Sequence, residues 1–325
     1  PRAVLRGVRA ACAGARHQLP DLPPTGVAHC QPRSARGCAD YVRLPAAYAR
    51  RAACSTRGRS GGGPRAPWAR GARWTWRARW SGCQAVCEPA FWAGFDRSSA
   101  QGFYDYFCQL TEHEPKRAAK FNLPHYSWLC INPKESEDLK LADDVLSLIP
   151  DFINKPNVLG IGEIGLNKNS KNELTVLEKH IQIAAEHDQL ILVHTPHLED
   201  KYKGTRMILD ALKNDSRIRP ERCVIDHVEE HTIGMVLDEG FWAGMTLYPE
   251  SKCSHSRAID MLENFGTNRI WMNSACDWGI SRPLAVPHAA LEMRQRGHQN
   301  DWIDKVTFQN PISFMSQSPK FKIKG

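Results

Sequence analysis

"VLGIGEIGL" at residues 158–166 and "LILVHT" at residues 190–195 are two short apolar segments that frame a longer periodic one. Between them, Leu174, Leu177 and Ile181 recur at helical spacing, which predicts an amphipathic helix. A strand that is apolar along its whole length is buried on both faces, and two such strands joined by a helix are typical of a parallel βαβ unit. These residues therefore favour an α/β protein built on a parallel sheet.

The same alternation continues outward in both directions from this unit. Strands are predicted at residues 84–91, 125–133, 158–166, 190–195, 223–227, 242–247 and 270–275. Helices are predicted at residues 98–114, 139–149, 173–187, 202–213, 231–239, 255–264 and 286–297, with Pro150 ending the second of them. Seven successive βα units predict a TIM-type (β/α)8 barrel whose first βα unit is missing or garbled.

The N-terminal segment 1–82 differs from the rest of the chain in composition. It contains 16 Arg and two Asp but no Lys or Glu, a net charge of +14, whereas the remainder has 27 basic and 33 acidic residues. This segment is rich in Arg, Gly, Ala and Pro and has few aliphatic side chains to bury, so we expect it to be disordered. It could also be the product of GC-rich DNA that is translated out of frame or upstream of the true start. The alternatives are a basic arm that binds phosphates and a targeting peptide.

Cysteine usage and hydropathy restrict the class of protein further. Four of the 11 Cys lie in the segment 1–82 and seven lie beyond it, with no CxxC pair in the body. We expect the body cysteines to be reduced and packed, which indicates a cytoplasmic protein. No apolar run reaches the roughly 18 residues of a membrane helix, so no span is predicted. The predicted domains are the anomalous segment 1–82, a barrel at 83–319 and a solvated basic tail at 320–325.

Polar residues stand at the carboxyl ends of four predicted strands, the edge that carries the reacting groups in such barrels. They are Glu163, His194, His227 and Asp277. Two imidazoles and two carboxylates suit a divalent ion such as Zn²⁺, Mn²⁺ or Mg²⁺. We expect one or two ions, with Glu163 as a ligand able to bridge two of them and Asp277 as the base that takes a proton from metal-activated water.

Each of these residues also has a structural interpretation. A histidine at a strand end is more often a hydrogen-bonded core residue than a ligand, Glu163 could be a buried acid paired with an Arg, and Asp277 could cap the next helix. Four such coincidences at equivalent strand ends favour the metal site. Near them, Glu229 and His231 could contact the ligands from outside, or belong to a helix cap or a solvated face.

Aromatic residues near the predicted strand ends have two interpretations. They are Trp92, Phe95, Trp242 and Trp278. They could line an apolar substrate pocket, or they could pack in the core, as aromatic side chains at such places do more often.

The quoted segments resemble a known family. "GIGEIGLN" resembles the "GEIGLD" signature of TatD-type metal-dependent hydrolases, "LVHTPH" and "IDH" resemble two of its metal-binding strands, and "NSACDWG" resembles its terminal aspartate motif. Phrases such as "EPAFWAGFD" and "DHVEEHT" resemble the EboC-like subgroup found in bacterial Ebo gene clusters. The resemblance covers residues 84–319 and implies an amidohydrolase-like barrel with a one- or two-metal centre. It implies that Glu163, His194, His227 and Asp277 are ligands, with Asp277 also serving the attacking water.

Three features depart from the family pattern. Its first strand ends in His-x-His, but the only histidines at positions 1–110 are His17 and His29. Asn167 stands where nuclease members have Asp, and His197 stands where they usually have Arg. Losing that Arg removes a bidentate phosphate clamp. Together with a body net charge of −6, these substitutions argue against DNA as the substrate.

The sequence therefore predicts a metal-dependent hydrolase that cleaves an ester, amide or phosphoester bond of an unidentified small molecule. Two alternatives stay open. The first is a non-catalytic or degenerate barrel with a binding role in a biosynthetic cluster, and the second is a TatD-like deoxyribonuclease. His197, Asn167 and Trp278 are predicted to contact the substrate or support the ligands. The sequence does not define the oligomeric state.

Overall fold

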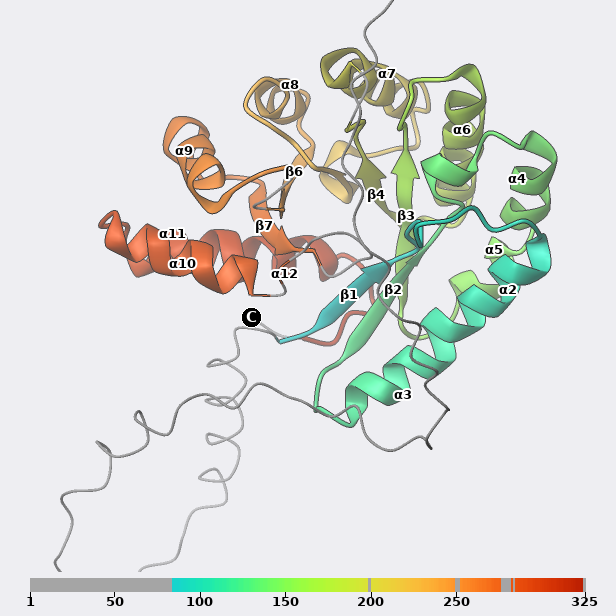
Figure 1. Ribbon diagram of the computed structural model, residues 1–325, viewed down its shortest axis with the longest axis horizontal. Coiled ribbons are helices and arrows are strands. Elements are labelled where there is room, and N and C mark those ends of the chain that lie inside the picture. The colour runs from blue at the N-terminus through green and yellow to red at the C-terminus, as the bar shows by residue number, and fades with distance from the viewer. Residues whose placement is uncertain (1–83, 198–199, 249–251, 276–281, 283, 324–325) are drawn as a thin grey trace, which may run out of the picture. The chain divides into compact units, whose positions relative to one another are not determined.

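The computed structural model describes residues 84–197, 200–248, 252–275, 282 and 284–323, all within one compact unit. Its sheet is parallel throughout, and each strand pairs with the next one in the sequence (Figure 1). The strands are β1 Val86–Pro89, β2 His125–Leu129, β3 Val158–Gly165, β4 Leu190–His194, β5 Cys223–Asp226, β6 Trp242–Leu247 and β7 Ile270–Ser274. This curled sheet of seven described strands confirms the predicted TIM-type α/β fold. The predicted segment 1–82 lies outside the described residues.

Helices follow the strands and cover the outer face of the sheet (Figure 1). The α-helices are α2 Ala100–Cys108, α3 Glu114–Ala119, α4 Leu139–Leu146, α5 Ile149–Ile153, α6 Lys171–Glu186, α7 Lys201–Lys213, α8 Ile233–Asp238, α9 His255–Phe265, α10 Ala285–Gln295, α11 Asn300–Asp304 and α12 Asn310–Met315. Short 3-10 helices occupy Pro133–Glu135 (η4) and Pro220–Arg222 (η5), and single π-turns occupy Gln109–His113 (η3) and Lys305–Gln309 (η6). Every predicted strand and helix has a counterpart.

Pro150 does not end a helix as predicted. The helix expected at 139–149 is divided into α4 and α5, and Pro150 lies in the first turn of α5. A proline is accommodated there because the amide of a first-turn residue has no partner within the helix. The chain therefore bends at Ser147 and Leu148 and continues as a second short helix.

The inner face of the sheet is filled by aromatic side chains at the amino ends of the strands. Phe314 of α12 is fully buried there. Its ring centroid lies 6.3 Å from that of Trp128, 5.8 Å from that of Trp242 and 5.1 Å from that of Trp271. The pocket interpretation of Trp242 is wrong, because its indole N–H donates to the carbonyl of Glu221 (2.8 Å) at this end of the sheet.

The C-terminal segment adds to this aromatic layer. Phe321 is 8% exposed, and its ring lies 4.9 Å from that of Tyr126. The Lys320 ammonium donates to the carbonyl of Val158 (2.9 Å), and the amide of Lys322 donates to the Tyr126 hydroxyl (2.9 Å). The prediction of a solvated tail is therefore wrong for Lys320 and Phe321, which contact backbone carbonyls and an aromatic ring, whereas the Lys322 side chain is exposed.

The described cysteines agree with the prediction of packed, reduced thiols. All five are free, and three of them, Cys130, Cys223 and Cys253, are buried. Burial raises the pKa of the Cys253 thiol to about 12, so this thiol stays protonated and unreactive near neutral pH. Among the helices that the structure describes, none has both the length and the apolar composition needed to cross a bilayer.

Candidate metal centre

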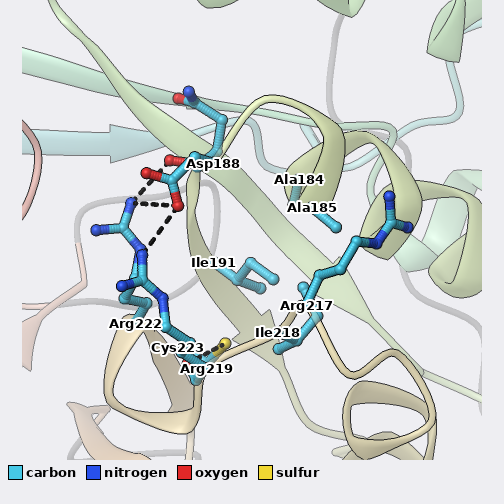
Figure 2. A pocket seen from close by; sticks show the side chains of 10 residues that line it. Ala184, Ala185, Asp188, Ile191, Arg217, Ile218, Arg219, Arg222 and Cys223 are labelled. Atoms are coloured by element: carbon cyan, nitrogen blue, oxygen red, sulfur yellow. Dashed lines mark hydrogen bonds and ion pairs between the residues drawn. The ribbon is translucent and has the colours of Figure 1, made fainter.

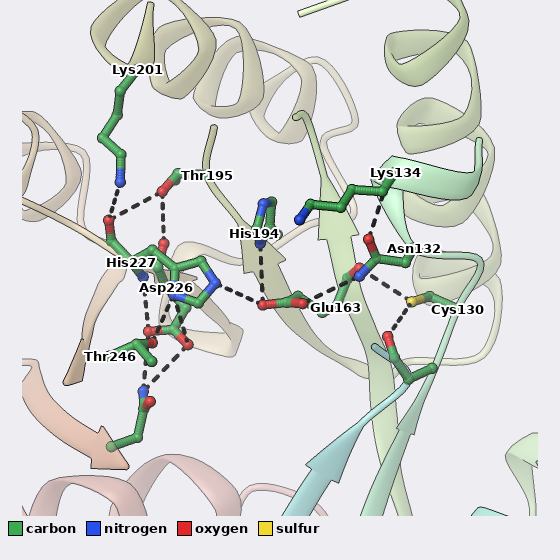
Figure 3. Close-up of polar contacts among 12 residues, drawn as sticks. Cys130, Asn132, Lys134, Glu163, His194, Thr195, Lys201, Asp226, His227 and Thr246 are labelled. Atoms are coloured by element: carbon green, nitrogen blue, oxygen red, sulfur yellow. Dashed lines mark hydrogen bonds and ion pairs between the residues drawn. The ribbon is translucent and has the colours of Figure 1, made fainter. Parts of the chain in front are cut away.

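Three of the four predicted ligands meet at the carboxyl edge of the sheet (Figure 3). Glu163 belongs to β3, His194 ends β4, and His227 directly follows β5. Oε1 of Glu163 lies 2.8 Å from Nε2 of His227 and 3.3 Å from Nδ1 of His194. One ligand atom from each residue lies within 4.8 Å of the others. The fourth predicted ligand, Asp277, and the neighbouring Trp278 lie outside the described residues.

A glycine brings the first two ligands together. Gly165 pairs with His194 in the β3–β4 register. A Cβ atom at Gly165 would lie 2.0 Å from the carbonyl oxygen of His194, and its φ of +144° is a conformation that other residues rarely adopt. The glycine therefore permits the close approach of the two strands, and this explains why the signature segment is glycine-rich.

The backbone of His227 is held in an unusual conformation. Its φ is +60°, a region that costs free energy for a residue with a Cβ atom. Its amide donates to Oδ1 of Asp226 (2.8 Å), and its carbonyl accepts from the Lys201 ammonium (2.6 Å) and from the Thr195 hydroxyl (3.2 Å). These contacts compensate for the strain and orient the imidazole toward Glu163.

The ring of His227 is oriented as a metal-binding histidine would be. Its Nδ1 lies 2.7 Å from the Thr246 hydroxyl, which leaves Nε2 to face the centre. Behind it, the buried Asp226 carboxylate accepts from the Asn273 amide (3.1 Å). A Cβ atom at Gly244 would lie 2.5 Å from Oδ1 of Asp226, so this glycine makes room for the carboxylate.

The protonation states suit a divalent cation. Burial lowers the pKa of His194 to about 4, although the charge of Glu163 acts in the opposite direction. Burial raises the pKa of Glu163, but the two imidazoles act against it, His194 more than His227, and the pKa is well below its usual value. A neutral imidazole and an ionised carboxylate are the forms that bind metals.

His194 provides a direct test of the metal interpretation. Both of its ring nitrogens are buried, and neither has a hydrogen-bond partner among the described residues. Its contact with Glu163 at 3.3 Å lacks the alignment of a hydrogen bond. A buried polar atom without a partner costs about 1–3 kcal/mol. A cation shared with Glu163 and His227 would satisfy one of these nitrogens, so the residues fit a divalent ion.

The remaining predicted residues lie around this centre in different ways. Glu229 lies 3.2 Å from the Lys201 ammonium and 3.6 Å from Arg257; the lysine thus connects it to His227. Asn167 is buried, and its backbone N–H donates to Oε2 of Glu173 (3.0 Å) in the turn before α6.

The two remaining histidines are more accessible. His197 is half-buried, and burial together with nearby lysines lowers its pKa. His231 is exposed, and the structure gives it no contact with the three ligands among the described residues.

Sequence reasoning missed four residues that support the ligands: Asp226, Thr246, Lys201 and Asn132. Asp226 precedes the predicted ligand His227 in the quoted "IDH" segment, and this position could have indicated that it supports the ligand. The other three approach from distant segments, and Asn132 donates from 31 residues away to Oε2 of Glu163 (3.3 Å).

A small cavity lies at the opposite end of β4 (Figure 2). Its lining includes Ile191, Cys223 and the Arg219–Asp188 ion pair (2.9 Å). A second arginine, Arg222, donates to the carbonyl of Asp188 (2.7 Å). Its volume of about 20 Å³ accommodates a single water molecule. This cavity is therefore too small for a substrate and is separated from the metal centre by the length of the strand.

Residues 95–314 match the family model described as TatD related DNase. The chain belongs to this family. An uncharacterized metal-dependent hydrolase of Methanocaldococcus jannaschii is 24% identical to this TatD-family chain over 221 residues, which cover 68% of the chain and 85% of that protein. These relationships indicate a metal-dependent hydrolase.

Two solved structures are similar to this chain, one of them a TatD-like protein. A TatD-like protein from Archaeoglobus fulgidus has a TM-score of 0.59 and 25% identity, and the match covers 74% of this chain and 92% of that one. A phosphotriesterase homology protein from Escherichia coli, solved with phosphate in its active site, has a TM-score of 0.50 and 13% identity over 72% of this chain and 99% of that one. The second similarity is one of fold.

Proposed function

We propose that this TatD-family chain hydrolyses an ester, amide or phosphoester bond of a small molecule with the help of a divalent ion. The observation that carries the proposal is the group formed by Glu163, His194 and His227, in which both ring nitrogens of the buried His194 lack hydrogen-bond partners among the described residues. A divalent ion held there would polarise the scissile bond and activate water for attack. Zn²⁺, Mn²⁺ and Mg²⁺ are the candidate ions.

The residues of the chain have separate roles in this proposal. Glu163 supplies the negative charge, and the two imidazoles supply nitrogen donors. Thr246 and Lys201 fix the ring and backbone of His227. Asp277 is proposed as the proton acceptor because of its place in the family motif. His197 and Trp278 are proposed to contact the substrate, and Asn167 to shape the turn beside it.

A binding role without catalysis is the second candidate. It is favoured by one observation, the absence of a His-x-His pair from positions 1–110. A deoxyribonuclease is disfavoured by His197 at the position of the usual Arg and by the net negative charge of residues 83–325. The EboC-like subgroup and the cytoplasmic location stay predictions.

Metal reloading tests the proposal. The purified chain is dialysed against a chelator, reloaded with Zn²⁺ or Mn²⁺ and analysed for bound metal by mass spectrometry. We expect at least one ion per chain, together with hydrolysis of p-nitrophenyl esters or phosphates that depends on the ion. Absence of bound metal would overturn the proposal, and stoichiometric metal without turnover of any probe would favour the binding role.

A further inference from the structure

The side-chain amide of Asn132 lies against the outer oxygen of Glu163 (Figure 3). Asn132 is 4% exposed and caps η4 just after β2. Its Oδ1 accepts the backbone N–H of Lys134 (3.1 Å), and its Nδ2 lies 3.3 Å from Oε2 of Glu163. The first contact fixes the orientation of the amide, because exchanging its oxygen and nitrogen would place two N–H donors together. The NH₂ group must therefore face the carboxylate.

The two oxygens of Glu163 consequently have different surroundings. Oε1 faces both histidines, whereas Oε2 accepts from Asn132. A carboxylate can bridge two metal ions by giving one oxygen to each. The hydrogens of the Asn132 amide carry positive partial charge and contact Oε2, so they would compete with a second ion for this oxygen.

The neighbouring carboxylates are held by other partners. Asp226 accepts from the amide of His227 (2.8 Å) and from Asn273 (3.1 Å). Glu229 is paired with Lys201 (3.2 Å). Among the described residues, the Glu163 carboxylate contacts Asn132, His194 and His227, and neither Asp226 nor Glu229 contacts it.

The side chain of Lys134 extends from η4 toward the centre (Figure 3). The Lys134 ammonium lies 4.4 Å from the centroid of the Trp92 indole ring, a distance typical of a cation–π contact. Figure 3 shows the Lys134 side chain extending toward His194 and the Glu163 carboxylate. An ammonium group near the centre disfavours a second divalent cation by electrostatic repulsion.

We infer that Asn132 limits this centre to a single divalent ion. The inference rests on the proposed function, since it presupposes that the three ligands hold a metal. It also replaces the expectation that Glu163 bridges two ions. Two-ion centres stabilise both the attacking and the leaving oxygen of a phosphoryl displacement, whereas a single Lewis acid suffices to polarise a carbonyl. A single-ion centre therefore suits carboxylic esters and amides better than phosphodiesters.

The experiment counts ions bound to the full chain and to three variants. Asn132→Asp replaces the amide by a carboxylate in the same place, and Asn132→Ala removes the donor without adding charge. Asn300→Asp adds a carboxylate at the exposed start of α11 and serves as the matched control. Each protein is saturated with Mn²⁺, and bound metal is measured by mass spectrometry and by the electron paramagnetic resonance spectrum. Circular dichroism verifies that each variant is folded.

The expected result is one ion in the wild-type chain, with the spectrum of an isolated Mn²⁺, and one ion in Asn300→Asp. Asn132→Asp is expected to bind a second ion and to show the spectrum of a coupled pair. Two ions in the wild-type chain would overturn the inference, as would an unchanged count in both Asn132 variants. A wild-type chain that binds no ion refutes the proposed function instead, so the two failures are distinguishable without any measurement of turnover.

The substrate preference follows from the same variants. With p-nitrophenyl acetate and bis(p-nitrophenyl) phosphate as probes, Asn132→Asp is expected to shift the ratio of the two rates toward the phosphodiester by about 10-fold or more. An unchanged ratio in a variant that has gained an ion would overturn the preference for carboxylic esters and amides.

Discussion

The two ends of the sheet use the same strands for opposite purposes. At the amino ends, Trp128, Trp271 and Phe314 fill the interior with apolar rings that pack against one another. At the carboxyl ends, His194 is buried and Glu163 is largely shielded from solvent, but both are polar, and the imidazole lacks hydrogen-bond partners among the described residues. The aromatic layer at the amino ends stabilises the fold by excluding water. The candidate ligands at the carboxyl ends reduce stability, because buried polar groups there lack hydrogen-bond partners. Substitutions at the two ends should therefore change different measurements.

The largest effect is expected at the amino ends. Phe314→Ala removes the ring that contacts three tryptophans, and it should lower the free energy of unfolding by about 3–5 kcal/mol. Urea denaturation followed by tryptophan fluorescence measures this change. Metal affinity of the molecules that remain folded should be unaltered. A loss of metal affinity equal to the loss of stability would show that the two ends are not independent.

A pair of buried histidines sharpens the comparison. His180 of α6 has a pKa lowered to about 4 by burial, as His194 has. Unlike His194, it has two partners, since Nδ1 contacts the carbonyl of Val176 (2.9 Å) and Nε2 accepts from Ile131 (3.2 Å). These partners require the neutral ring, with its proton on Nδ1. His180 therefore acts as a structural residue that resists protonation.

This resistance predicts a pH dependence of stability. Between a pKa of about 6.5 in the unfolded chain and about 4 in the folded chain, the unfolded state binds the proton and the folded state does not. Stability should consequently fall as the pH decreases through this window, by at most about 3 kcal/mol. Urea titrations at pH 7 and pH 4.5 on the wild-type chain and His180→Gln measure it. An equal pH dependence in both proteins would contradict the assignment.

Glu163→Gln should have the opposite effect to Phe314→Ala, with a loss of metal affinity and little change in stability. The substitution keeps the shape of the side chain but removes the only carboxylate of the described ligand set. Affinity for Zn²⁺ should fall by about 100-fold or more, while the free energy of unfolding of the metal-free chain changes little. Titration calorimetry gives the affinity, and Glu178→Gln on the exposed face of α6 is the control. Unchanged zinc affinity would exclude Glu163 as a ligand.

The smallest effect on metal affinity is expected for Thr246, which contacts the candidate ligand His227 but does not face the centre. Thr246→Val keeps the buried volume and removes the hydroxyl that lies 2.7 Å from Nδ1 of His227. We expect zinc affinity to fall by about 10-fold, because the ring loses its fixed orientation. Thr246→Ser should retain most of the affinity, since it keeps the hydroxyl. If both variants bind zinc equally well, the orientation of His227 depends on Lys201 and Asp226 alone.

The fold was predictable because its strands are continuous apolar runs separated by periodic helices. This pattern located every described strand, and Glu163, His194 and His227, predicted at strand ends, lie close together in the candidate centre. The incorrect predictions concern residues that are compatible with two different local structures or environments. Pro150 is compatible with the end of one helix and with the start of another, and Lys320 is compatible with water and with the carbonyls that it contacts.

The supporting contacts of the site were less predictable. Asn132 and Thr246 are polar residues in otherwise apolar segments, and nothing in their neighbouring sequence indicates what they face. Their roles depend on the register between strands, such as the approach of β2 to β3 that brings Asn132 to Glu163. A charge or hydrogen bond between distant segments becomes visible only when the sheet is assembled.

The position of Phe314 and Phe321 at the amino ends of the strands has a consequence for biosynthesis. All seven described strands precede these two residues in the sequence, yet the layer inside the sheet is completed by their rings. A nascent chain that has exposed its last strand still lacks the side chains that seal its interior. Strand pairing can therefore begin during translation, but the exclusion of water from the amino end must wait until Phe321 has left the ribosome. During this interval, chaperones that recognise exposed tryptophans have their best opportunity to bind.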